Sequence, residues 1–220
     1  MIFPYFLPFY APFGTLGAFI KIKSPIPNKK ALFEVGIAGP FASFFMSLFF
    51  LVLGFSLLPD AEGVREYITQ YHPWSETGEG ALTLGSSLLF EYIRITLGGE
   101  HLPMYEIYHF PFIFAGWIGL LVTALNLLPI GQLDGGHISY ALLGKNAKYV
   151  AYAAFFALIL LLFYSTSYII WMILIPIIIR FKHPPTMNDR IELDLRRKTL
   201  AWCSYLIFIT CFSPMPIYIY

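Results

Sequence analysis

An aspartate stands in one of the most apolar parts of this 220-residue sequence. The segment NLLPIGQLDGGH, Asn126 to His137, follows FPFIFAGWIGLLVTAL, a run without a charged residue. An ionisable side chain at membrane depth is costly and usually faces a cavity, a partner or a metal ion. The alternative is that Asp134 caps a helix that restarts after Pro129 and Gly131, since aspartate is a favoured helix cap.

The residues around the aspartate favour a polar site. Pro129 and Gly131 interrupt the helix, Gly135 and Gly136 allow backbone to approach closely, and Asn126 supplies a side-chain amide upstream. A broken helix at membrane depth is tolerated only where it is buried in protein or lines a wet cavity. We therefore expect this segment to form the wall of such a site.

Histidines are the next candidates for metal ligands. His137 follows Asp134 by three residues, so the two side chains share a face if the turn is helical. A catalytic zinc normally has three protein ligands and a water molecule, however, and no histidine here begins an H-E-x-x-H motif. The other four are expected at surfaces or interfaces: His72, His101, His109 and His183. The given residues do not assemble an ordinary hydrolytic zinc site.

Composition indicates what must position these residues. Hydrophobic residues make up 58% of the chain and charged residues 12%, and the mean hydropathy is +0.68. Ordinary soluble domains have roughly 25% charged residues. We therefore predict an all-α polytopic membrane protein with a single membrane domain. The net charge of +1 suggests no nucleic-acid partner.

Apolar runs divide the chain into about four to five transmembrane helices, each needing roughly 20 residues. The predicted segments are a hairpin or re-entrant segment at 1–30, a span at 33–58, a polar loop with an amphipathic helix at 59–109, a span with the LDG motif at 110–143, two short spans at 147–181, a basic connector at 182–198 and a span at 199–213. The amphipathic helix is expected within ALTLGSSLLFEYI. Ser165-Thr166-Ser167 is the predicted break between the two short spans.

Charge placement supports this division. Lysines and arginines cluster before the first span, after the LDG span and in the connector, whereas the 59–109 loop is acidic. If all basic loops are cytoplasmic, an even number of crossings must separate Lys148 from Arg180. The two cysteines, Cys203 and Cys211, are too far apart on one helix for a disulfide and are expected to pack as small apolar residues.

Two further segments have informative patterns. In EVGIAGPFASFFMS, Gly39, Ser43 and Ser47 form a strip of small residues that favours close helix packing. In PFGTLGAFIKIKSPIP, the GAFIKIKS part alternates apolar and polar residues, which predicts a short strand or hairpin. Such an edge could pair with an extended peptide, although an interfacial loop is an equal alternative.

Three segments resemble one family in the family's order. NLLPIGQLDGG is similar to the N-x-x-P-x-x-x-L-D-G motif of site-2 proteases, the intramembrane zinc metalloproteases. FGTLGAFIKIKSPIPNKKALFEVGIAGP is similar to the hairpin and Gly-Pro helix that follow the zinc-binding helix there. The tail KHPPTMNDRIELDLRRK resembles the bacterial, cyanobacterial and plastid branch.

This resemblance implies a Zn²⁺ ion held by two histidines of an HExxH helix and by the aspartate of the LDG motif, here Asp134. The glutamate of HExxH would be the general base for a zinc-bound water. Asn126 would contact the substrate or stabilise the oxyanion. The hairpin residues Gly17, Ala18, Phe19, Ile20 and Lys21 would bind a transmembrane protein substrate as an added strand. The expected protein is an integral membrane protein of the bacterial inner membrane.

The HExxH helix would stand just before PYFLP, and the given sequence begins at Met1. We therefore expect an N-terminally truncated chain, inactive without HExxH, in preference to a genuine zinc-less relative, because the LDG segment is intact. Two other functions remain open. One is a non-catalytic scaffold of the same fold that binds transmembrane helices. The other is an ion or metal transporter, for which no inverted repeat is found.

Overall fold

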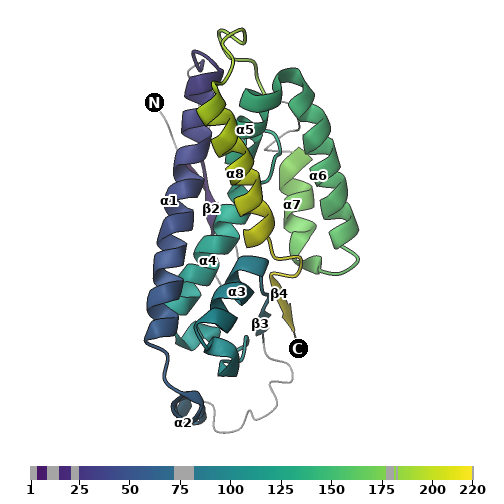
Figure 1. Ribbon diagram of the computed structural model, residues 1–220. Helices are drawn as coiled ribbons and strands as arrows, with labels where there is room; N and C mark the ends of the chain where they lie inside the picture. The colour runs from purple at the N-terminus through teal and green to yellow at the C-terminus, as the bar shows by residue number, and fades with distance from the viewer. Residues whose placement is uncertain are drawn as a thin grey trace.

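The fold is mostly helical, which confirms the predicted class at that level (Figure 1). The computed structural model describes residues 4–8, 15–20, 25–71, 82–176, 181 and 183–219. The helices are α1 Lys29–Ser56, α2 Ala61–Tyr71, α3 Leu88–Thr96, α4 Pro111–Asn126, α5 Asp134–Leu143, α6 Ala147–Leu161, α7 Ile169–Leu174 and α8 Leu195–Cys211. Single 3₁₀ turns are η1 Gly99–His101, η2 Ile107–His109, η3 Gly144–Asn146 and η4 Thr166–Tyr168. The strands are β1 Pro4–Pro8, β2 Thr15–Ile20, β3 Leu82–Leu84 and β4 Ile217–Ile219.

Helix α1 has 28 residues, and it is long and apolar enough to cross a membrane. Its start is capped by Asn28, whose side chain accepts a hydrogen bond of 3.0 Å from the amide of Ala31. Only 22% of the residues in its most apolar 18-residue stretch are buried inside the protein, so much of the apolar surface of α1 faces outward. Among the other helices of the described ranges, α8 has 17 residues, α4 has 16 and α6 has 15. The count of four to five spans therefore stays a prediction.

Helices α1 and α4 pack along the predicted strip of small residues. Thr123 of α4 donates a hydrogen bond of 2.8 Å to the hydroxyl of Ser43 on α1. The hydroxyl of Ser47 donates to the carbonyl of Ser43 at 2.6 Å, and a Cβ at Gly119 would collide with that hydroxyl. The packing role predicted for Ser43 and Ser47 is confirmed.

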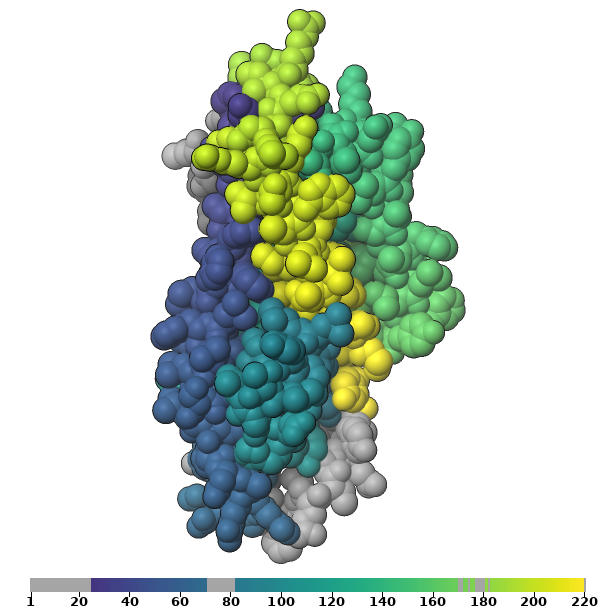
Figure 2. Space-filling model, viewed as in Figure 1, coloured from purple at the N-terminus to yellow at the C-terminus, as the bar shows by residue number. Residues whose placement is uncertain are grey.

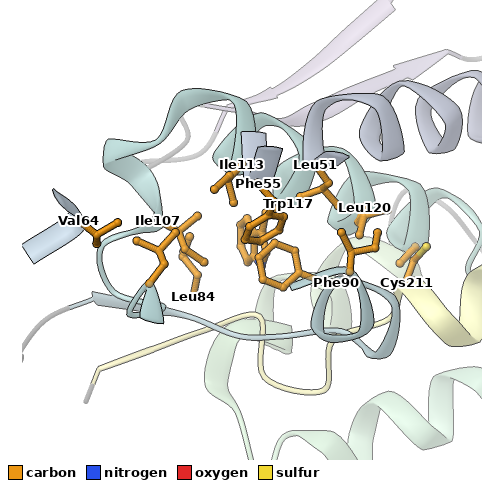
Figure 3. Packing of buried hydrophobic residues seen from close by; sticks show 13 residues of the cluster. Leu51, Phe55, Val64, Leu84, Phe90, Ile107, Ile113, Trp117, Leu120 and Cys211 are labelled. Carbon is orange, nitrogen blue, oxygen red and sulfur yellow. The ribbon is translucent and has the colours of Figure 1, made fainter. Parts of the chain in front are cut away.

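The largest hydrophobic cluster joins α1 and α4 to the segment between them in sequence (Figure 3). Its centre is Trp117, which is 3% exposed and lies beside Leu51, Phe55 and Phe90 in the same cluster. The indole of Trp117 donates a hydrogen bond of 2.7 Å to the carbonyl of Gly85. The loop before α3 is therefore fastened to the middle of α4.

The predicted amphipathic helix occupies only the second part of the described segment 82–93, because a strand precedes it. Leu82–Leu84 forms β3 and pairs antiparallel with the C-terminal strand β4. Helix α3 begins only at Leu88, because Ser87 is extended and its side chain accepts a hydrogen bond from the amide of Phe90. The pairing partner of β3 lies at the far end of the chain, where local periodicity could not reveal it.

The third apolar stretch is divided where the serines and threonine predicted. Helix α6 ends at Leu161, η4 covers Thr166–Tyr168, and α7 starts at Ile169. The side chain of Ser165 accepts a hydrogen bond of 3.3 Å from the amide of Ser167 and so begins the new turn. In both overall views α8 lies between α1 and the α6–α7 pair (Figures 1 and 2). Both cysteines of α8 are free, as expected, with Cys203 exposed and Cys211 buried.

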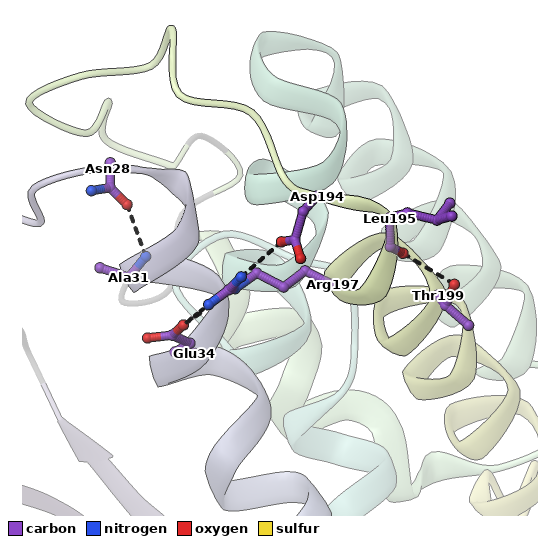
Figure 4. Close-up of polar contacts among 7 residues, drawn as sticks. All are labelled: Asn28, Ala31, Glu34, Asp194, Leu195, Arg197 and Thr199. Atoms are coloured by element: carbon purple, nitrogen blue, oxygen red, sulfur yellow. Dashed lines mark hydrogen bonds and ion pairs between the residues drawn. The ribbon is translucent and has the colours of Figure 1, made fainter.

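The connector before α8 is fastened to the base of α1. The amides of Met187 and Asn188 donate hydrogen bonds of 2.9 and 3.0 Å to the carbonyls of Ile26 and Pro27. Arg197 in the first turn of α8 reaches back to Asp194 at 2.7 Å and across to Glu34 of α1 (Figure 4). The connector is thus an ordered strap, residues 183–194, rather than a loose linker.

Candidate functional site

The break between α4 and α5 positions the two predicted site residues. Asn126 is the last residue of α4 and Asp134 is the first residue of α5. Between them the chain turns tightly, with hydrogen bonds of 2.7 Å from the amide of Ile130 to the carbonyl of Leu128 and 3.1 Å from Leu133 to Ile130. The structure therefore places the amide of Asn126 and the carboxylate of Asp134 on the two sides of the break between α4 and α5.

Each glycine near the turn has a steric reason. Gly131 has a φ of 54°, a conformation that side chains other than glycine rarely adopt. A Cβ at Gly135 would overlap the carbonyl oxygen of Leu127, and one at Gly136 would overlap that of Gly131. The two glycines after Asp134 thus allow α5 to fold back against the turn that precedes it.

Asp134 is half-buried, and its side chain does not cap α5. The N-cap is Leu133, which has no side-chain capping bond, so the capping alternative is wrong for this residue. The position in the first turn still favours a carboxylate, because the helix dipole is positive there. Across from it lies Gly39 of α1, whose added Cβ would stand 3.6 Å from Asp134 Oδ2.

Neither proposed site side chain is engaged by the part of the protein that the structure describes. Asn126 is also half-buried. Within the described ranges, no hydrogen bond or ion pair is made by the side chain of Asn126 or Asp134. Half-buried polar groups that the fold does not use are available for a ligand or for water.

Helix α1 approaches the start of α5 closely. A Cβ at Gly36 would lie 2.8 Å from the Cβ of His137 and 3.0 Å from the carbonyl oxygen of Asp134. Gly36 is buried, and no larger residue fits there without moving a helix. The small size of Gly36 therefore allows α1 to approach the LDG segment closely.

The strap brings a second histidine to this region. Nδ1 of His137 lies 2.7 Å from Nε2 of His183, and the ring of His183 stacks on Tyr140 with centroids 4.7 Å apart. Tyr140 donates a hydrogen bond of 2.7 Å to Asp189, which also accepts one of 2.6 Å from Thr186. His183 had been expected at a surface or interface. No pattern in the sequence indicates that it contacts His137.

The pKa of Asp189 lies below its usual range. Partial burial raises this pKa, but hydrogen bonds from Thr186 and Tyr140 and the charge of Lys29 lower it by more. The carboxylate is therefore ionised at neutral pH and holds α5 to the strap.

The described residues do not supply a complete zinc site. No group of three histidine, cysteine, aspartate or glutamate side chains among them could hold a metal ion. Asp134 has the chemistry of one ligand, a carboxylate without a protein partner, but a catalytic zinc needs three protein ligands. His137 turns its Nδ1 toward His183 instead of completing such a set.

The proposed substrate-binding residues fall in the N-terminal hairpin. Strand β2 pairs antiparallel with β1, with Phe19 opposite Tyr5 and Ala18 opposite Phe6. The predicted hairpin is confirmed, and Gly17 to Ile20 lie in its second strand. Lys21 lies outside the described residues.

Comparisons with known proteins agree with the site-2 protease resemblance. Residues 3–164 match the family described as "Peptidase family M50". The chain is 29% identical over 213 residues to "Probable zinc metalloprotease EGY1, chloroplastic" of Arabidopsis thaliana, covering 96% of this chain and 37% of that protein. The protein of the same name from Oryza sativa subsp. japonica is 30% identical over 209 residues, covering 94% of this chain and 34% of the relative.

A third relative has a different kind of name. "DDT domain-containing protein PTM" of Arabidopsis thaliana is 33% identical over 134 residues, covering 61% of this chain and 7% of that protein. No solved structure matches the chain. The chain spans about a third of the length of the two EGY1 relatives. Since the family match extends over most of the sequence, the chain belongs to peptidase family M50, the site-2 proteases.

Proposed function

We propose that this chain belongs to an intramembrane zinc metalloprotease that cleaves transmembrane segments of other proteins. The observation that carries the proposal is Asp134. It is a half-buried carboxylate at a helix break, without a partner among the described residues, in a chain that belongs to peptidase family M50. A membrane-embedded carboxylate that the fold does not use is a site residue by default.

The proposed role of Asp134 is to hold Zn²⁺ as one ligand, with the other ligands supplied from outside the described residues. Zinc bound there would lower the pKa of a coordinated water and so provide a hydrolytic nucleophile. Asn126, at the other end of the same turn, would donate its amide to a substrate carbonyl. Its place at the end of α4 fits a fixed donor, because both flanking helices are packed.

The hairpin residues Gly17 to Lys21 are proposed to hold substrate as an extended strand. Peptide bonds in a helix are shielded, so a transmembrane substrate has to be unwound before hydrolysis. A strand edge stabilises the unwound form by main-chain hydrogen bonds. The location is proposed as a cellular membrane. The bacterial inner membrane stays a prediction, since the EGY1 relatives are named chloroplastic.

The experiment is to express the full-length gene product and measure its zinc content with and without Asp134→Ala. We expect about one zinc per molecule in the parent and a large loss in the variant, because a site with one ligand fewer binds zinc much more weakly. Asp60→Ala is the control, since this exposed aspartate lies before α2, outside the α4–α5 turn, and should leave zinc content unchanged. Equal zinc in the parent and in Asp134→Ala would exclude Asp134 as a ligand.

A non-catalytic scaffold that binds transmembrane helices is the second candidate. It is favoured by the lack of an H-E-x-x-H motif in these 220 residues and by the PTM relative, whose name specifies no protease. The DNA upstream of the Met1 codon separates the two. In-frame codons for an HExxH motif upstream of Met1 would support the protease. An upstream stop codon, with no HExxH codons between it and Met1, would support the scaffold.

A further inference from the structure

A cavity of about 290 Å³ lies beside α5, away from Asp134. Gly136, Ser139 and Tyr140 line it, whereas Asp134 and Ile138 point toward the glycines of α1. At 100° per residue these two sets occupy opposite faces of the helix. The cavity is therefore separate from the proposed zinc side.

The lining of the cavity is basic. Lys145 and Lys148 both contribute to it, together with His183 and Phe181, and among the described residues no aspartate or glutamate does. Neither lysine forms an ion pair with another residue of the described ranges. The nearby carboxylate of Asp189 is already occupied by hydrogen bonds from Tyr140 and Thr186. Two lysines against one nearby carboxylate leave the described surroundings of the cavity with a net positive charge.

The two lysines stand at the wrong end of a helix for cations. Lys145 lies in η3, two residues before the start of α6, and Lys148 lies in the first turn of α6. The helix dipole is positive there, so cations are disfavoured and an anion is favoured. An anion in the cavity would relieve the conflict of the lysines with the dipole.

An apolar stripe continues from the lysines along α6. Its members are spaced by three or four residues, lie on one face and remain exposed: Tyr149 at 62%, Tyr152 at 45%, Phe156 at 60% and Leu160 at 47%. The ring of Tyr152 packs 5.2 Å from that of Phe181, which lines the cavity. The stripe and the cavity are thus one continuous surface, basic at one end and apolar along the rest.

We propose that this surface binds an anionic phospholipid, with the phosphate of the headgroup in the cavity against Lys145 and Lys148 and an acyl chain along the α6 stripe. Basic pockets between helices at the cytoplasmic side of a membrane are suited to acidic headgroups. A free anion would match only the cavity and would leave the stripe unexplained. Large exposed apolar faces on a protein of a membrane-embedded family are suited to lipid tails.

The test uses the full chain purified in a non-ionic detergent. Binding of phosphatidylglycerol, phosphatidylcholine and inorganic phosphate is measured by native mass spectrometry and by the shift of the thermal unfolding midpoint. We expect phosphatidylglycerol to bind at least about tenfold more tightly than phosphatidylcholine, since an anionic surface contributes roughly fivefold per lysine. Equal binding of the two lipids would overturn the proposal, as would inorganic phosphate binding as tightly as phosphatidylglycerol.

Variants locate the site. Lys145→Gln with Lys148→Gln should weaken phosphatidylglycerol binding about 30-fold, and Lys145→Arg with Lys148→Arg should retain it. The control pair, Lys30→Gln with Lys198→Gln, removes the same charge outside the cavity and should change affinity less than twofold. A control pair that loses as much binding as the cavity pair would show a diffuse charge effect and overturn the proposed site. The outcome is independent of zinc content, so the proposed protease can fail while this site stands.

Discussion

The two ring nitrogens of His183 fix which nitrogen of His137 carries a proton. Nδ1 of His183 lies 2.6 Å from the carbonyl oxygen of Pro184, which can only accept, so this nitrogen donates. Nε2 of a neutral His183 must then accept from Nδ1 of His137, 2.7 Å away. His137 is left with an unprotonated Nε2. The strap therefore selects one tautomer of a histidine that lies one turn from Asp134.

The first prediction tests this pair. His183→Phe keeps a ring against Tyr140 but leaves Nδ1 of His137 without its acceptor, and we expect a loss of about 1 to 3 kcal/mol in the free energy of unfolding. Nitrogen-15 NMR of the labelled parent should show His137 protonated at Nδ1. A spectrum of His137 protonated at Nε2 in the parent would contradict the assigned tautomer.

The same pair predicts a pH dependence. The pKa of His183 is lowered, chiefly because burial disfavours the charged ring, although the Pro184 carbonyl and Asp189 act in the opposite direction. Below the ordinary pKa of about 6.5 the unfolded chain binds a proton at His183 that the folded chain does not. The contribution of His183 to the free energy of unfolding should thus be fully present above that pH and should decrease as the pH drops toward the lowered pKa. Thermal unfolding at pH 7.5 and 5.5 should show a larger decrease for the parent than for His183→Phe.

The second prediction concerns the closeness of α1 to α5. Gly36→Ala places a methyl group 2.8 Å from the Cβ of His137 and should destabilise the protein by about 1 to 3 kcal/mol. Gly39→Ala is the matched variant on the same helix, where the new methyl group would be in ordinary contact, 3.6 Å from Asp134 Oδ2. We expect it to be neutral or stabilising by up to about 1 kcal/mol, since alanine is the better helix former. Chemical unfolding in detergent measures both, and equal effects would show that the packing is looser than the structure indicates.

The third prediction concerns the hold of the strap on α5. Tyr140→Phe removes a donor from Asp189 and should cost about 1.5 kcal/mol, because the lost hydrogen bond involves a charged acceptor. Tyr149→Phe, at a tyrosine that is 62% exposed, should change stability by less than about 0.5 kcal/mol.

The lowered pKa of Asp189 gives this effect a pH signature. The carboxylate contributes its stabilisation above its ordinary pKa of about 3.9 and loses it as the pH falls through the lower folded pKa. The difference between Tyr140→Phe and the parent should therefore be constant near neutral pH and shrink below about pH 4. A difference that grows on acidification would contradict the assigned ionisation.

The fourth prediction concerns the fastening of the α3 loop to α4. Trp117→Phe leaves the buried carbonyl of Gly85 without its donor and loses part of the central ring, so we expect a loss of about 2 to 4 kcal/mol. Trp202→Phe, at a tryptophan that is 63% exposed, should fall within about 0.5 kcal/mol of the parent. Thermal unfolding by circular dichroism distinguishes the two.

Local patterns predicted the elements whose signals are local. The apolar run 33–58 identified α1, the small residues identified a closely packed face of that helix, and Ser165-Thr166-Ser167 identified the break before α7. Asp134 and Asn126 were located at a helix break because proline and glycine interrupt helices wherever they occur. Their roles at a zinc site stay predictions.

Contacts between distant segments were the part that local patterns could not predict. The pairing of β3 with β4 joins the middle of the chain to its end, and the pairing of His137 with His183 depends on where the strap passes. Such features follow from tertiary packing, which overrides local preference.

The strap also determines the order in which the molecule can be completed during synthesis. Its hydrogen bonds join Met187 and Asn188 to Ile26 and Pro27, at the start of the first long helix. A ribosome adds about 5 to 20 residues per second, so α1 emerges roughly ten to thirty seconds before the segment that fastens its base. During that interval the helix can enter the membrane, but the pair of His137 and His183 cannot yet form. The polar centre of this protein is therefore finished late, after the apolar framework around it is in place.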